Sequence, residues 1–243
     1  MSVDAGRMRL VGLEGRVALV TGAGRGIGKR IAETLASLGA RTAASDLVPP
    51  ILAGVTGVEL DVTSERSVDE GFSEVERQLG APDILVLNAG VFVIEPTGET
   101  ALESWRRTMS VNLDGAFLCA RRALPAMRDR GFGRIVALGS ASGILADPPQ
   151  TAAYSASKAG VMSLMRSIAR EYSGSGITAN SLAPAIIRTP MAGDAIDALA
   201  GLTLVGRVGE TDDVAATVAF LCSEHASYVT GATFDINGGY FLH

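Results

Sequence analysis

Two hydrophobic patterns alternate along the chain from Arg16 to its end. Short and mostly continuous apolar runs, typical of strands that are covered on both faces, lie at Val17–Val20, Arg41–Ser45, Val58–Leu60, Ile84–Leu87, Arg134–Leu138, Thr178–Ala183 and Thr233–Ile236. Helical spacing of apolar residues fills the stretches Gly26–Leu38, Ser64–Leu79, Leu102–Arg130, Ala153–Tyr172 and Thr211–Ser223. Repeated β-α units of this kind predict an α/β protein: a doubly wound, Rossmann-type three-layer α/β/α sandwich with a mostly parallel seven-stranded sheet.

The chain length fits one domain, because 243 residues lie within the range of a single large α/β unit. With 47% hydrophobic and 19% charged residues, the chain can bury a full core without disulfides. No internal repeat, low-complexity tract or interdomain linker interrupts the pattern. We predict a flexible N-terminal arm over residues 1–12 and a single domain over residues 13–243.

Composition excludes several classes of partner. The 21 basic and 26 acidic residues are spread along the chain and leave a net charge of −5, which gives no basic footprint for nucleic acid. No apolar run approaches the ~18–20 residues of a membrane span, and the first residues lack the apolar core of a signal peptide. Cys119 and Cys222 show no CxxC spacing, and neither His225 nor His243 stands at metal spacing. We therefore expect a cytoplasmic protein without a metal site.

A glycine-rich segment follows the first predicted strand and runs into the first helix, with the order Thr21-Gly22-Ala23-Gly24-Arg25-Gly26-Ile27-Gly28. Glycines let the backbone turn tightly and approach a pyrophosphate, while the helix N-terminus presents free N–H groups to the anion. The spacing is TGxxxGxG rather than GxGxxG. The segment predicts a phosphate-binding loop; a plain strand-to-helix turn is the alternative.

Asp46 ends the second predicted strand, eighteen residues after Gly28. A carboxylate at this place accepts both hydroxyl groups of an adenosine ribose and repels a 2′-phosphate. The position therefore predicts NAD rather than NADP as cofactor. Arg25 in the glycine-rich segment points instead to NADP. The alternative interpretation of Asp46 is a solvent-exposed loop residue that binds no ligand.

Tyr154 and Lys158 are four residues apart in a helical pattern, so their side chains share one face. A phenol titrates near ~10, and a base for neutral pH needs a pKa about 2–3 units lower, or ~3–4 kcal/mol. One ammonium at ~4 Å supplies ~4 kcal/mol at an effective dielectric constant of ~20. The pair predicts a tyrosine that works as a general acid/base; an exposed tyrosine beside an ordinary lysine is the alternative.

With these motifs the chain resembles the short-chain dehydrogenase/reductase family, in its single-domain type with TGxxxGxG and YxxxK. The resemblance runs from about Leu13 to Tyr240, and the blocks that carry it beside the two motifs are Asp61 in Leu-Asp-Val-Thr, Asn88-Ala89-Gly90, Asn112, Ser140, and Pro184 followed by Ile187 and Thr189. It implies one dinucleotide-binding catalytic domain, an oxidoreductase that interconverts a secondary alcohol and a ketone by hydride transfer, and a homotetramer.

The resemblance also implies roles for individual residues. Tyr154 exchanges a proton with the substrate oxygen, Ser140 stabilises charge on that oxygen, and Lys158 holds the nicotinamide ribose and lowers the pKa of the tyrosine. Asn112 sits in an interrupted helix and anchors a water that links Lys158 to solvent. The cofactor-binding positions that follow are Gly22, Arg25, Gly26, Ile27, Gly28, Asp46, Asp61, Val62, Asn88, Ala89, Gly90, Tyr154, Lys158, Pro184, Ile187 and Thr189.

Three of these assignments carry alternatives. Asn112 is otherwise only a polar residue that breaks the helix. Ser140 lies fourteen residues before Tyr154 and Ser142 twelve, whereas many family members have the serine thirteen before; the position after the strand favours Ser140, with one extra residue in the Asp147–Pro149 loop. Asn88 borders the adenosine ribose or only braces the sheet.

The substrate is expected to be a neutral, fairly hydrophobic small alcohol or ketone, because the segments expected to line its pocket carry mainly apolar residues such as Ile144, Ile186 and Leu199. The alternatives are a 3-oxoacyl-[acyl-carrier-protein] reductase that uses NADPH, a dihydrodiol dehydrogenase and, more remotely, a non-catalytic nucleotide-sensing scaffold. Arg128 and Arg130 are the candidate contacts of an acidic carrier protein, but Ser175 stands where those reductases tend to carry a second arginine.

Overall fold

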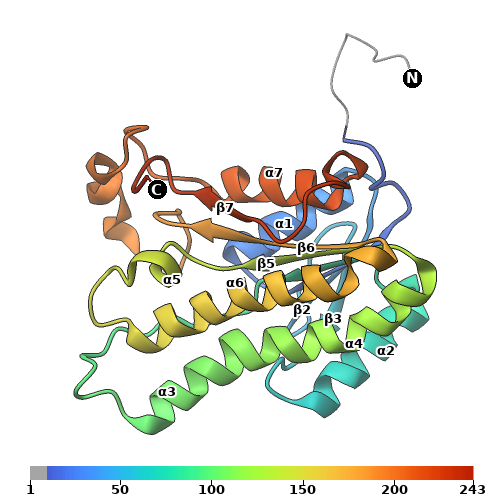
Figure 1. The fold of residues 1–243 in the computed structure, drawn as a ribbon, viewed down its shortest axis with the longest axis horizontal. Helices are drawn as coiled ribbons and strands as arrows, with labels where there is room; N and C mark the ends of the chain where they lie inside the picture. The colour runs from blue at the N-terminus through green and yellow to red at the C-terminus, as the bar shows by residue number, and fades with distance from the viewer. Residues whose placement is uncertain (1–9, 243) are drawn as a thin grey trace.

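A computed structural model describes residues 10–242 and shows one sheet between two layers of helices (Figure 1). Its seven strands pair in the order β3-β2-β1-β4-β5-β6-β7, and every pairing is parallel. The bounds are β1 Val17–Thr21, β2 Arg41–Asp46, β3 Thr56–Glu59, β4 Ile84–Leu87, β5 Gly133–Leu138, β6 Ile177–Pro184 and β7 Thr233–Ile236. The predicted doubly wound Rossmann-type fold is confirmed.

The α-helices are α1 Gly26–Ser37, α2 Glu65–Leu79, α3 Leu102–Met109, α4 Gly115–Arg130, α5 Ser142–Leu145, α6 Ala152–Tyr172 and α7 Thr211–Cys222. The stretch 102–130, which the apolar spacing predicts as one helix, is divided by a π-helical segment at Ser110–Asp114. The short helix α5 and the 3₁₀ segments at Ser173–Ser175, Asp194–Leu202 and Glu224–Ala226 have no counterpart among the predicted elements. Short helical turns escape a periodicity argument because they complete too few turns.

Two apolar cores lie on opposite faces of the sheet, because successive strand residues point to opposite sides. Leu19 belongs to the core that is closed by α2, α4 and α6, with the fully buried Phe72 of α2 and Met165 of α6. Its neighbour Val20 belongs to the core that is closed by α1 and α7, with Ile31 of α1. Strands buried on both faces explain the continuous apolar runs in the sequence.

Most of the predicted N-terminal arm, residues 1–9, lies outside the described residues. Leu10 packs against the core beneath α1 and α7, and the carbonyl oxygen of Val11 accepts a hydrogen bond of 2.9 Å from the backbone N–H of Glu224. Within the part of the chain that the structure describes, no helix has the length and apolar character needed to cross a bilayer.

Candidate active site

The glycine-rich segment joins the carboxyl end of β1 to α1. Gly22 has a φ of +62°, and a Cβ atom on it would lie 2.6 Å from Cα of Ala89. A Cβ atom on Gly28 would lie 2.3 Å from Nδ2 of Asn88. Helix α1 has neither a side-chain cap at Arg25 nor an acidic residue in its first turn, so its first N–H groups remain for an external anion. These features fit a dinucleotide pyrophosphate.

Asp46, at the carboxyl end of β2, is fixed beside this segment. Its Oδ2 accepts a hydrogen bond of 2.9 Å from the Gly24 N–H, and its Oδ1 accepts one of 2.8 Å from the Leu47 N–H. A Cβ atom on Gly24 would lie 2.7 Å from the same Oδ2, so a larger residue there would displace the carboxylate. The side chain of Arg25 is exposed at the start of α1.

Asp61 and Val62 follow β3. Oδ1 of Asp61 accepts hydrogen bonds from the backbone N–H and the hydroxyl of Thr63, at 2.9 and 2.7 Å, which hold the carboxylate at the carboxyl edge of the sheet. Val62 is buried, and a Cβ atom on Gly115 of α4 would approach its side chain to 2.7 Å.

Asn88 braces the end of β1. Its side-chain amide donates to the carbonyl oxygens of Thr21 and Gly22, at 2.9 and 2.8 Å. The backbone N–H groups of Asn88 and Ala89 both donate to the hydroxyl of Thr21. Because both amide hydrogens are engaged with β1, the geometry favours the bracing interpretation of Asn88 over donation to a ligand.

The carboxyl end of β6 approaches the glycine-rich segment. Pro184 ends the strand, and Ile187 is buried and pairs with Gly209. A Cβ atom on Gly26 would lie 3.8 Å from the side chain of Thr189. Residues about 160 positions apart in sequence therefore meet beside the N-terminus of α1.

Tyr154 and Lys158 both lie in the first turns of α6, near the carboxyl end of β5. Nζ of Lys158 is 5.7 Å from the centroid of the tyrosine ring and donates a hydrogen bond of 2.7 Å to the carbonyl oxygen of Leu138. The ring of Phe92 meets the Tyr154 ring edge-on, with centroids 4.8 Å apart. Ser140, two residues after β5, lies against the phenol and acts to lower its pKa. Three of the four predicted catalytic side chains thus converge.

The electrostatics of this cluster differ from the sequence-based expectation. Burial raises the pKa of Tyr154, and the hydrogen bond from Ser140 lowers it only in part. Burial also lowers the pKa of Lys158 to about 8. Loss of hydration therefore sets the direction of the Tyr154 pKa in the protein by itself, and the lowering of that pKa by Lys158 stays a prediction.

Asn112, the fourth predicted catalytic residue, lies in the π-helical segment and is 2% exposed. Its Oδ1 accepts from the Val91 N–H at 2.8 Å, and its Nδ2 donates to the Val91 carbonyl and to the Ser157 hydroxyl, each at 3.0 Å. The π-segment thereby ties the loop after β4 to α6. A Cβ atom on Gly90 would lie 3.3 Å from Oδ1 of Asn112 and 3.4 Å from Nζ of Lys158, so all three residues border one space.

The structure separates the two candidate serines. The hydroxyl of Ser142 donates a hydrogen bond of 2.6 Å to the carbonyl oxygen of Asp147, so it is directed into the following loop. Oγ of Ser140 accepts a hydrogen bond of 3.1 Å from the Ser142 N–H and faces Tyr154. The geometry favours Ser140 as the residue at the reacting centre.

Sequence reasoning missed two contributors to this cluster. Ser157 lies three residues after Tyr154, and helical spacing could have placed it on a face near the tyrosine; it links Asn112 to α6. Phe92 lies in one of the segments expected to line the substrate pocket, but its edge-on contact with the Tyr154 ring was not predicted.

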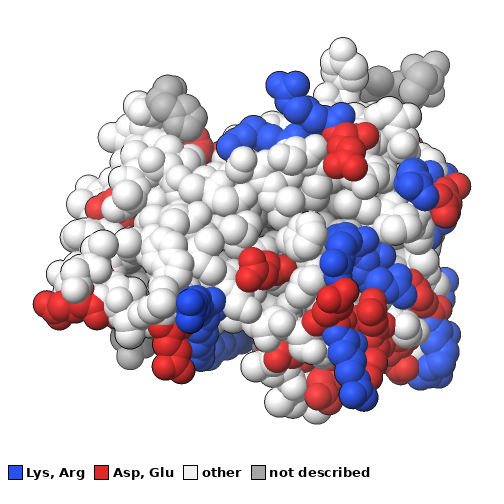
Figure 2. Space-filling view, turned by 60° about the horizontal axis from the view of Figure 1, so that its bottom comes forward, with Lys and Arg blue, Asp and Glu red and all other residues white. Residues whose placement is uncertain are grey.

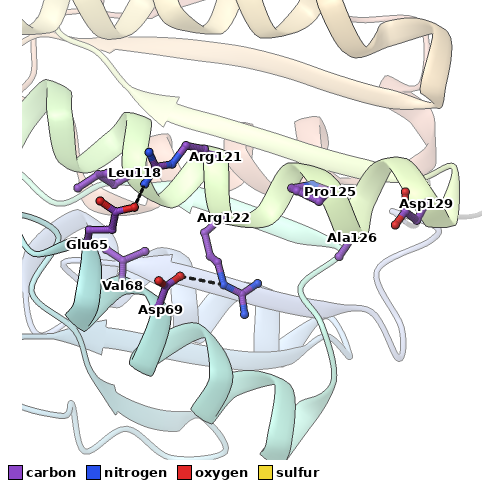
Figure 3. Close-up of a pocket in the computed structure, with 9 residues that line it drawn as sticks. All are labelled: Glu65, Val68, Asp69, Leu118, Arg121, Arg122, Pro125, Ala126 and Asp129. Atoms are coloured by element: carbon purple, nitrogen blue, oxygen red, sulfur yellow. Dashed lines mark hydrogen bonds and ion pairs between the residues drawn. The ribbon is translucent and has the colours of Figure 1, made fainter.

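A hollow of about 480 Å³ lies elsewhere, between α2 and α4 (Figure 3). It is crossed by the ion pairs Glu65–Arg121 and Asp69–Arg122, and none of the predicted site residues lines it. Figure 2 shows basic and acidic side chains interspersed over this end of the molecule. The mixed charge of this region is typical of two neighbouring helices whose surfaces face solvent.

Comparison with known proteins agrees with this geometry. Residues 22–241 match the family model described as "Enoyl-(Acyl carrier protein) reductase". The chain is 36% identical to the 2-dehydro-3-deoxy-L-rhamnonate dehydrogenase (NAD(+)) of Sphingomonas sp., over 98% of both chains. It is 37% identical to the 3-oxoacyl-[acyl-carrier-protein] reductase of Escherichia coli, over 94% of this chain and 98% of that one. The crystal structure of gox2181 superposes with a TM-score of 0.87 at 36% identity, covering 93% of this chain and 96% of the other.

Both the sequence relatives and the structural match extend over nearly the whole chain, across the glycine-rich segment, the Tyr154 cluster and the carboxyl edge of the sheet. The chain belongs to the short-chain dehydrogenase/reductase family and is an oxidoreductase that acts on CH–OH and keto groups with a nicotinamide cofactor.

Proposed function

We propose that the protein interconverts a secondary alcohol and a ketone with NAD(H), and that Tyr154 is its general acid/base. The observation that carries the proposal is the convergence of Tyr154, Ser140 and Lys158 at the carboxyl edge of the sheet. In open parallel sheets this edge is where ligands bind. The single domain over residues 13–243 holds the cofactor and the reacting groups together.

Residues of this chain account for binding of each part of the cofactor. The N–H groups at the start of α1, with Gly22, Arg25, Gly26, Ile27 and Gly28 around them, hold the pyrophosphate. Asp46 accepts the hydroxyl groups of the adenosine ribose, and the segments Asp61–Val62 and Asn88–Gly90 enclose the adenosine. Pro184, Ile187 and Thr189 border the nicotinamide. When bound, the nicotinamide accepts or supplies the hydride.

Proton transfer falls to the Tyr154 cluster. In alcohol oxidation, Oη of Tyr154 takes the proton from the substrate hydroxyl, and in ketone reduction it returns that proton. Ser140 donates a hydrogen bond to the substrate oxygen, where negative charge develops. Lys158 contributes a positive charge to the cluster and bonds the nicotinamide ribose, and Asn112 anchors the water path from Lys158 to solvent.

Replacement of the tyrosine tests this assignment. We expect Tyr154→Phe to lower kcat by about 10³-fold or more, while the dissociation constant for NADH, measured by fluorescence titration, changes less than about twofold. Ser140→Ala should lose about 10²-fold in kcat, and Ser142→Ala much less. Retained turnover in Tyr154→Phe would exclude the proposed role.

NAD is the proposed cofactor because the Asp46 carboxylate is held in place by two backbone N–H groups, where it would repel a 2′-phosphate. The relative from Sphingomonas is also named for NAD(+). We expect kcat/KM to be higher with NADH than with NADPH, and Asp46→Ser to narrow or invert that ratio, with Arg25 available to the phosphate. A wild-type preference for NADPH would contradict the assignment.

The proposed substrate is a small, mainly apolar alcohol or ketone. Ile144 and Leu199, at the predicted pocket walls, expose 40% and 42% of their surface. Assays with a panel of secondary alcohols, ketones and a dihydrodiol, each with both cofactors, would separate this reaction from dihydrodiol oxidation. Cofactor binding without turnover of any panel member would indicate a nucleotide-sensing scaffold instead.

A second candidate, reduction of a 3-oxoacyl carrier-protein thioester with NADPH, is favoured by the similarity to the Escherichia coli reductase. Both candidate contacts of a carrier already have partners within this chain. Arg130 donates to the Pro82 carbonyl oxygen at 2.6 Å and lies 3.5 Å from Asp83, and Arg128 lies 3.2 Å from Asp129. Turnover of an acetoacetyl thioester with NADPH at a higher kcat/KM than any simple ketone would establish this candidate.

We also propose a cytoplasmic homotetramer. Cys119 and Cys222 are both buried as free thiols, which suits a reducing compartment. The exposed Phe117 on α4 is a candidate contact for helix pairing between subunits. Sedimentation equilibrium at micromolar concentration tests the tetramer.

A further inference from the structure

The loop 146–151, which joins α5 to α6, is held from several sides. Two of its residues, Ala146 and Gln150, have φ values of 55° and 67°, in the left-handed region that non-glycine residues seldom adopt. Such conformations persist where the surroundings over-determine them, and they cluster at functional sites. This is the loop that contains the extra residue between Ser140 and Tyr154.

Hydrogen bonds from three other segments reach this loop. The Glu95 N–H donates to the Gln150 carbonyl oxygen at 2.7 Å, and the Ser142 hydroxyl donates to the Asp147 carbonyl oxygen at 2.6 Å. From the C-terminal tail, the hydroxyl of Tyr240 donates to Oδ2 of Asp147. The tail contact spans 93 residues of sequence and is a side-chain hydrogen bond at both ends.

Three hydrogen bonds, joined through the covalent frames of Asp147 and Ser142, lead from the tail to Ser140 at the reacting centre. Tyr240 bonds the carboxylate of Asp147, whose own carbonyl oxygen accepts the hydroxyl of Ser142. The backbone N–H of Ser142 donates to Oγ of Ser140, and Ser140 in turn acts to lower the pKa of Tyr154. Because Oγ of Ser140 accepts from Ser142, its own hydrogen is left to be donated at the centre.

The tail that carries Tyr240 is itself well anchored. The Tyr240 N–H donates to the Asn237 carbonyl oxygen at 2.9 Å, which closes a turn. The Val205 N–H donates to the Gly238 carbonyl oxygen at 3.0 Å, so the turn is joined to the segment that follows β6. The hydrogen bond to Asp147 raises the pKa of Tyr240, so the hydroxyl stays protonated and able to donate throughout the neutral range.

We propose that Tyr240 is a positioning residue for the reaction: through the carboxylate of Asp147, it holds the loop 146–151 in the conformation in which Ser142 orients the hydroxyl of Ser140 toward Tyr154. This role rests on the proposed function, since it acts on the reacting centre. A tail contact that only stabilised the fold would affect unfolding and leave the chemistry of Tyr154 unchanged.

The test compares Tyr240→Phe with Tyr228→Phe, a matched control whose side chain is fully exposed at 101%. We expect Tyr240→Phe to speed amide hydrogen exchange of residues 146–151 and to lower kcat about five- to tenfold. The affinity for NADH should change less than about twofold. Asp147→Asn keeps an acceptor for the Tyr240 hydroxyl and should lose less activity than Asp147→Ala.

The pH profile is the decisive measurement. Ser140 and Lys158 are the polar groups placed against Tyr154, and the Phe92 ring covers its edge. The hydrogen bond from Ser140 favours the phenolate, so its loss raises the pKa of Tyr154. The midpoint of kcat/KM for alcohol oxidation should therefore move to higher pH in Tyr240→Phe and stay unchanged in Tyr228→Phe.

An unchanged pH midpoint in Tyr240→Phe would overturn the proposal, even with lower thermal stability, because it would show a tail anchor without effect on Ser140. Unchanged hydrogen exchange in residues 146–151, or equal effects of both tyrosine variants, would also overturn it. Absence of wild-type turnover across the alcohol and ketone panel would overturn the proposed function itself. That failure is distinguishable, because hydrogen exchange reads the Tyr240 contact without substrate.

Discussion

Lys158 is expected to destabilise the folded protein. Its side chain is 5% exposed, and burial lowers its pKa from 10.5 to about 8. Each pKa unit corresponds to about 1.4 kcal/mol, so at neutral pH the buried ammonium costs about 3 kcal/mol. Removal of the charge should recover part of this free energy, since the hydrogen bond to the Leu138 carbonyl oxygen, worth about 1–2 kcal/mol, is lost as well.

We therefore predict that Lys158→Met abolishes turnover and raises the free energy of unfolding by about 1–2 kcal/mol at pH 7. The stability gained by Lys158→Met should decrease as the pH rises above 8. Below pH 8 the lysine is protonated in both states, and the gain is constant. Between pH 8 and 10.5 the unfolded wild type binds more protons than the folded one, so wild-type stability rises with pH. The difference between the two proteins should shrink by about 2 kcal/mol between pH 7 and 9.5.

The assay is urea unfolding followed by circular dichroism at one protein concentration, because subunit association would make the result concentration-dependent. Lys29→Met is the matched control: this exposed lysine lies 3.8 Å from Glu33, and its loss should change stability by no more than about 0.5 kcal/mol at either pH. A Lys158→Met protein that is less stable than wild type at pH 7, or whose advantage is equal at both pH values, would refute the reasoning.

Two further predictions concern close packing. Gly28→Ala should destabilise the protein by about 1–3 kcal/mol and weaken NADH binding, because the new Cβ would lie 2.3 Å from Nδ2 of Asn88. Thermal unfolding and a binding titration check this against the control Gly98→Ala, whose Cβ meets no atom within 4 Å. Equal behaviour of the two variants would contradict the prediction. Burial raises the pKa of both Cys119 and Cys222 to about 12. A thiol reagent at pH 8 should therefore label neither cysteine in the folded protein and both cysteines in denaturant. Rapid labelling of the native protein would show instead that the core opens locally.

The alternation of apolar runs and helical spacing was sufficient to predict the sheet and its long helices, apart from the division at Ser110–Asp114, and to place the candidate site at the carboxyl edge. Both patterns depend on local geometry, on the two-residue period of a strand and the 3.6-residue period of a helix. Leu19 and Val20 face different cores because consecutive strand residues always do. The spacing of Tyr154 and Lys158 is local in the same sense, and so is the order of the glycines before α1.

Other features depend on residues that are distant in sequence. The tertiary contacts add the evidence that separates Ser140 from Ser142, because the hydroxyl of Ser142 is taken by the Asp147 carbonyl oxygen. The division of the helix at Asn112 also has no signal in apolar spacing: the side chain is held there by Val91 and Ser157, on two other elements.

The sequence by itself determined the fold class and was enough to propose the phosphate-binding segment and the acid/base pair, because each rests on residues that are neighbours along the chain. Only the tertiary structure decided the direction in which the pKa of Tyr154 moves and the contact from Tyr240 to Asp147. The physical reason is that the free energy of a charge depends on how much water and how many dipoles surround it, and these surroundings are assembled from segments as far apart as the loop after β5 and the C-terminal tail.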